Sequence, residues 1–122
     1  MELNSPRKDP YSSMSRAEKG LEDEGYNHHF EVMDLNEMKD EHGQRYQPDE
    51  VQIDQIIRLP EKQLVMSGDK YPREPKAIYA INTKKGTKGI LKENMNDAGG
   101  EVVEAFLRRV DRNDQLKESY TS

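Results

Sequence analysis

The sequence contains no cysteine, and this absence excludes several kinds of chemistry. Without thiols the chain cannot form disulfide bonds, bind zinc through thiolates, use a cysteine nucleophile or act as a thiol redox switch. It also has no tryptophan and only two phenylalanines, so large side chains for a core are scarce. Because disulfides are rare in the cytosol, the absence of cysteine agrees with the cytoplasmic location that we expect.

Long apolar runs are absent as well. No stretch approaches the roughly 20 apolar residues that a transmembrane helix needs. Met1–Pro10 has no apolar centre, so it lacks the pattern of a secretory signal. We therefore expect a soluble protein that makes no contact with membranes.

The length and composition allow one small domain with loose ends. The chain has 122 residues, of which 35% are charged and 32% belong to the hydrophobic set. Such a chain buries only a small core. The apolar residues are clustered, and we expect a disordered arm over 1–12, a single domain over 13–112 and a frayed tail over 113–122.

The most informative segment is Ala77–Leu91, which has the pattern of a β-hairpin. Two short apolar runs are joined by Thr83–Gly86, and Gly86 stands where a hairpin loop needs a positive φ. The first run is almost continuously apolar or small. This is expected of a central strand that is covered on at least one face.

Apolar periodicity predicts one helix near each end of the chain and a strand that follows the first helix. Ser13 suits the N-cap of the first helix, and Gly25 suits its C-terminal end. The second helix is predicted over 103–110, where apolar residues recur three and four positions apart. Alternation at His29–Asp34 indicates a strand.

Another strand is predicted at Val51–Leu59. Ile56 interrupts its alternation, which indicates a bulge or a second packing surface. The preceding segment, Leu35–Tyr46, is polar and acidic and offers little to bury. Glu61–Pro75 contains several prolines and a glycine and is expected to be a long loop.

These elements predict an α+β fold with two layers. A mostly antiparallel sheet of about four strands would bury the N-terminal and C-terminal helices on its apolar face. The expected core consists of Leu21, Phe30, Val32, Ile53, Ile57, Ile78, Ala80, Ile90, Val103, Phe106 and Val110.

Three segments resemble a family of small, uncharacterised bacterial α+β proteins. They are Gly25–Phe30 (GYNHHF), Tyr46–Asp54 (YQPDEVQID) and the hairpin from Tyr79 to Leu91, and together they lie within Met14–Leu91. Some members carry the label phosphoribosylpyrophosphate synthetase. That enzyme needs two sizeable α/β halves and a phosphate-binding loop, for which this chain is too short. The resemblance therefore implies a fold and not an activity.

Charge is distributed unevenly along the chain. Glu18–Glu50 holds eleven acidic and three basic residues, whereas Arg58–Lys92 holds nine basic and three acidic residues. Such a basic region can attract an anionic partner, or it can keep a sheet edge soluble. The candidate contacts with an anion or partner are Arg58, Lys84, Lys85, Lys88 and Lys92.

The other polar residues form no recognisable catalytic or metal-binding motif. Phosphate-binding and dinucleotide-binding loops are absent, and no serine has the setting of a nucleophile. Adjacent His28 and His29 would point to opposite faces of a strand, which makes them poor joint ligands for an ion near Asp34, Glu37 or Asp40. We therefore expect no catalytic residues, no metal site and no cofactor.

The sequence favours a non-catalytic module that binds a protein partner or regulates one. The alternative is a module that binds nucleic acid or another polyanion through the basic hairpin. A small enzyme or metal-binding protein that uses the histidines and the acidic segment is a third hypothesis. Steep dependence of binding on salt would favour the second, and stabilisation by a divalent ion would favour the third.

Overall fold

The computed structural model describes residues 13–58, 75–94 and 100–120. Their elements, in chain order, are α1 (Ser13–Asp23), β1 (His28–Asp34), β2 (Glu37–Asp40), β3 (Arg45–Tyr46), the 3-10 helix η2 (Pro48–Glu50), β4 (Val51–Arg58), β5 (Pro75–Thr83), β6 (Lys88–Asn94), α3 (Gly100–Leu107) and β7 (Asp111–Tyr120). The expected arm over 1–12 and almost all of the expected loop over 61–75 lie outside the described residues.

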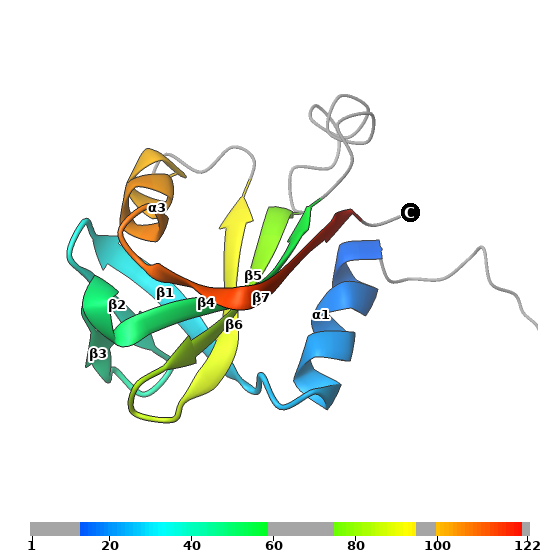
Figure 1. Ribbon diagram of the computed structural model, residues 1–122, viewed down its shortest axis with the longest axis horizontal. Helices are drawn as coiled ribbons and strands as arrows, with labels where there is room; N and C mark the ends of the chain where they lie inside the picture. The colour runs from blue at the N-terminus through cyan, green and yellow to red at the C-terminus, as the bar shows by residue number, and fades with distance from the viewer. Residues whose placement is uncertain (1–12, 59–74, 95–99, 121–122) are drawn as a thin grey trace, which may run out of the picture.

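The strands of the described residues form one mixed sheet of seven, in the order β3-β2-β1-β6-β5-β4-β7. Neighbouring strands are antiparallel except at two places, where β1 pairs with β6 and β4 pairs with β7 in parallel. The sheet is strongly curved, and α1 and α3 lie on its two sides (Figure 1). In the part of the chain that the structure describes, neither helix is long and apolar enough to cross a membrane.

This architecture corrects the expected fold. The prediction of a two-layer domain with a mostly antiparallel sheet of about four strands is wrong, because the sheet is larger, mixed and covered on both faces. On β5, the side chains of Ala77, Tyr79 and Ile81 join the apolar cluster on the side of α3. Those of Ile78 and Ala80 join the cluster on the side of α1. Successive side chains of a strand point to opposite faces, so an almost continuous apolar run requires cover on both.

The predicted core positions fit this arrangement. Val103, Phe106 and Leu107 are buried and follow the three- and four-residue spacing of a helix face, so α3 packs one apolar stripe on the sheet. Every predicted core residue is buried except Val32 and Ile57, which are partly buried against the two clusters.

The hairpin and the bulge are confirmed. β5 and β6 are antiparallel neighbours, and Gly86 in their turn has a φ of 88°. In β4 the register shifts between Ile53 and Gln55. As a result Ile56 joins Ile53 in the cluster on the α3 side, whereas Ile57 packs on the α1 side.

Three strands lie where the sequence analysis predicts none. β2 and β3 occupy the segment that was expected to have little to bury, and they bury Met38 and Tyr46. Residues 113–120, expected to be part of a frayed tail, belong to β7 and pair with β4. Polar sequences can form such strands, because the backbone pairs with a neighbour while most side chains face solvent.

Candidate functional site

An open groove lies where the parallel strands β1 and β6 separate. The two strands pair from His28 with Gly89 to Phe30 with Leu91, and within the described residues they do not pair further along. The groove has a volume of about 560 Å³ and is lined by β1, β6 and the first turn of α3. Seven of its ten lining residues are apolar, and the other three are His29, Glu31 and Lys92.

Gly89 allows the two strands to approach closely at the base of this groove. A Cβ atom at position 89 would lie 2.7 Å from the carbonyl carbon of His28 and 2.8 Å from a ring carbon of Phe30. Real Cβ atoms do not approach other atoms so closely. The absence of a side chain at this position is therefore a condition for the parallel pairing of β1 and β6.

Two large apolar side chains near the end of β1 are exposed. Met33 and Leu35 each have 42% of their surface accessible to solvent. Met33 lines the groove, whereas Leu35 lies in the turn between β1 and β2 and does not line it. A flexible, exposed thioether is typical of surfaces that adapt to a partner.

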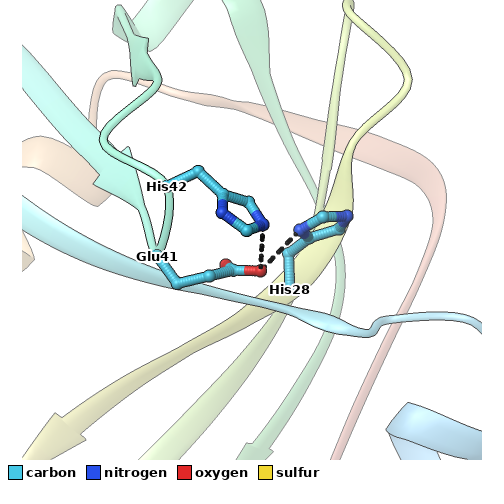
Figure 2. Close-up of side chains that lie close together, drawn as sticks. All are labelled: His28, Glu41 and His42. Atoms are coloured by element: carbon cyan, nitrogen blue, oxygen red, sulfur yellow. Dashed lines mark hydrogen bonds and ion pairs between the residues drawn. The ribbon is translucent and has the colours of Figure 1, made fainter.

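A polar cluster of His28, Glu41 and His42 lies beyond the other end of the β1–β2 pairing (Figure 2). The Nδ1 atom of His28 is 2.8 Å from Oε2 of Glu41, and Nε2 of His42 is 3.4 Å from the same oxygen. The two imidazole rings are edge to face, with centroids 6.1 Å apart. The backbone N–H of His29 donates a hydrogen bond of 2.9 Å to the other oxygen of Glu41. This hydrogen bond and the contact with His28 lower the pKa of Glu41 to about 2, so its carboxylate is ionised at neutral pH.

The turn after β2 presents two members of this cluster. Asp40 is buried and accepts hydrogen bonds from the backbone N–H groups of His42 and Gln44 at 2.9 and 3.0 Å. Tyr46 donates a third hydrogen bond to Asp40, and Gly43 closes the turn with a φ of 85°. Burial alone would raise the pKa of Asp40, but these hydrogen bonds hold it below its ordinary value.

A buried carboxyl group lies between β6 and α3. Glu93 is 2% exposed and accepts a hydrogen bond of 2.8 Å from the hydroxyl of Tyr79. Its other oxygen is 3.5 Å from Nζ of Lys76, which is an ion-pair distance without a well-formed hydrogen bond. Burial raises the pKa of Glu93, whereas the interactions with Glu93 and with Lys76 lower the pKa of Glu104.

The basic residues expected to contact an anion do not converge on one site. Arg58 pairs with Ala77 on β5, whereas Lys84 and Lys85 lie at the far end of that strand, in the turn after Thr83. Six residues of strand separate the two ends, which is about 20 Å. Arg58 is also engaged within the molecule, since its Nε atom is 2.6 Å from a carboxylate oxygen of Glu118.

The remaining two basic residues have partners as well. Lys92 forms an ion pair with Glu18 of α1 at 3.1 Å. The ammonium group of Lys88 lies 4.4 Å from the centroid of the Tyr26 ring, a cation–π arrangement. Each of these lysines thus stabilises the contact between β6 and the N-terminal part of the chain.

Sequence reasoning did not bring His28 together with Glu41 and His42. It weighed His28 with His29 and with acidic residues nearby in the chain, whereas the fold brings His28 to Glu41 and His42. The antiparallel register pairs Phe30 with Asp40, and continuing it by two residues places His28 opposite His42. A prediction that residues 28–42 form a β-hairpin would have placed His28 close to His42.

Comparisons with family models, with curated proteins and with solved structures gave no match. The resemblance to a family of small bacterial proteins consequently stays a prediction.

Proposed function

We propose that the protein is a non-catalytic module that binds another protein, and that the groove between β1, β6 and α3 accepts an extended apolar segment of that partner. The observation that carries the proposal is the separation of β1 and β6 beyond Phe30 and Leu91. Both strands continue there, each paired on its outer side only among the described residues.

The inner edges of such diverging strands offer backbone groups to a third strand. A peptide that adds to a sheet edge gains affinity from main-chain hydrogen bonds and specificity from pockets for its side chains. The apolar lining, the exposed Met33 and the polar rim of Glu31 and Lys92 supply suitable surroundings for a segment with apolar and charged positions.

Binding of a polyanion through the hairpin has less support. A phosphate-binding surface needs several cations that point to one place, and its affinity scales with the number of phosphates that they contact. Lys88 and Lys92 already contact Tyr26 and Glu18, and Arg58 is far from the turn.

Site-specific photo-cross-linking tests the proposal. The photoreactive residue benzoylphenylalanine is placed at Met33 in one variant and at Leu35 in another, and both are expressed in the cells that make the protein. Because the two side chains are equally exposed, they have equal access to chance collisions. We expect a discrete protein adduct from position 33 and none from position 35.

The comparison of the adducts from positions 33 and 35 decides whether the partner binds in the groove. Equal adducts from Met33 and Leu35, or none from Met33, would contradict binding in the groove. A Val102→Lys substitution on the wall of the groove should abolish the adduct from position 33 without unfolding the protein, because Val102 is only partly buried.

A further inference from the structure

We propose that His28, Glu41 and His42 form a binding site for a divalent transition-metal ion, of which Zn²⁺ fits best. The site is separate from the groove, so the inference does not rest on the proposed function. Two imidazole nitrogens and one carboxylate oxygen form a ligand set that suits zinc and the related ions of the first transition row.

The distances between the donor atoms fit one ion. Ligand atoms at about 2.0–2.1 Å from a tetrahedral Zn²⁺ are roughly 3.4 Å apart. The carboxylate oxygen of Glu41 lies 2.8 Å from Nδ1 of His28 and 3.4 Å from Nε2 of His42. All three donor atoms lie within 4.8 Å of one another. Figure 2 shows both rings directing a nitrogen at the same carboxylate oxygen, so the three donor atoms converge on one place.

The backbone holds the ligands before any ion arrives. Glu41 and His42 occupy a turn that is fixed by two amide hydrogen bonds to the buried carboxylate of Asp40. The N–H of His29 holds the second oxygen of Glu41, which orients the first toward the rings. Metal ligands in proteins are commonly oriented by such outer hydrogen bonds.

Three protein ligands leave a fourth position of a tetrahedral ion for water or for a group of another molecule. His42 has 73% of its side chain exposed, and the side chains of His28 and Glu41 are 38% and 37% exposed. An ion at this place is reached directly from solvent. The site is therefore suited to reversible metal uptake or to a metal bridge with a partner, and not to a closed structural centre.

A second group of possible ligands, Glu18, Glu22 and His29, is less suitable. Nζ of Lys92 lies 3.1 Å from the carboxylate of Glu18, so a positive charge already occupies its surroundings. This group also has a single imidazole. It provides the control, because His29 is adjacent to His28 in the chain and belongs to the other set.

Isothermal titration of the full chain with zinc chloride tests the inference. We expect one Zn²⁺ ion per chain, and a loss of affinity of at least about tenfold in His42→Ala and in Glu41→Gln, since each removes a ligand. His29→Ala should bind zinc as the wild type does, because the backbone N–H that contacts Glu41 is retained.

Chemical shifts of the imidazole nitrogens give a second readout that is independent of affinity. Zinc should shift the ring nitrogens of His28 and His42 and leave those of His29 unchanged. Absence of zinc uptake by the wild type, or unchanged affinity in His42→Ala, would overturn the inference. A loss in His29→Ala as large as that in His42→Ala would also overturn it, because the ion would then lie at the glutamates of α1.

Discussion

Replacement of Gly89 by alanine tests the parallel pairing of β1 with β6, on which the groove and the position of His28 depend. The added Cβ atom would lie 2.7 Å from the carbonyl carbon of His28 and 2.8 Å from the ring of Phe30. The neighbour at His28 is backbone within a strand, so the conflict cannot be relieved by a side-chain rotation. Overpacking of this kind costs about 1–3 kcal/mol. With an unfolding entropy of roughly 0.2 kcal/mol/K for a domain of about 100 residues, Tm should fall by about 5–15 °C.

Gly20→Ala is the matched control for this measurement. Gly20 lies within α1, and a Cβ atom there would have no atom within 4 Å other than those of its chain neighbours and of the helix backbone. Alanine favours a helix interior over glycine by about 0.5–1 kcal/mol, so this variant should be more stable than wild type. Thermal unfolding followed by circular dichroism measures both changes. A Gly89→Ala protein that melts at or above the wild-type Tm would refute the close approach of β1 and β6.

Four further predictions concern the packing and the charged groups around the sheet. Phe106→Ala should lower the free energy of unfolding by about 3–5 kcal/mol, because Phe106 is fully buried; a urea midpoint equal to wild type would contradict the packing of α3. The free energy of unfolding of Glu93→Gln, relative to that of wild type, should rise with pH. The pKa of Glu93 is raised in the folded state, so wild type loses stability as the pH rises through that pKa. The free energy of unfolding of Glu104→Gln, relative to that of wild type, should instead fall as pH rises toward the ordinary pKa of a glutamate, because the pKa of Glu104 is lowered. Urea titrations at several pH values measure both changes. Lys88→Gln should cost about 0.5–1 kcal/mol through the lost contact with the Tyr26 ring, and an unchanged stability would show that this cation–π contact contributes nothing.

Elements with a strong local signal could be predicted from the sequence. Gly86, with its positive φ, lies between two apolar runs and marks the β5–β6 hairpin without any distant contact. Phe106 belongs to a three- and four-residue spacing that only a helix face explains. Ile56 broke the alternation of β4, and the bulge there is the physical reason.

Elements that depend on distant partners could not be predicted in the same way. β2 has Met38 as its one buried apolar side chain, and β7 has only the partly buried Leu116, so neither displays an apolar pattern of its own. Backbone hydrogen bonds hold β2 beside β1 and β7 beside β4. The parallel pairing of His28 with Gly89 joins segments that are 61 positions apart, for which local periodicity carries no information.

The candidate sites follow from these long-range pairings and were missed for the same reason. The groove exists because β1 and β6 diverge after Phe30 and Leu91, and no residue type marks a divergence. The cluster of His28, Glu41 and His42 needs the register that places His28 opposite His42. Lys84 and Lys85 were correctly expected in an exposed turn, but their charge alone does not create a binding surface.

Hydrogen exchange with the partner bound tests binding in the groove most directly. The probe is the partner segment that cross-links to position 33, added in excess to the wild-type protein. Slower exchange is expected at the backbone amides of Glu31–Met33 or of Lys92 and Glu93, because an added strand pairs with one inner edge of the groove. Protection confined to the turn at Thr83–Gly86, or unchanged exchange along both edges, would contradict a binding site between β1 and β6.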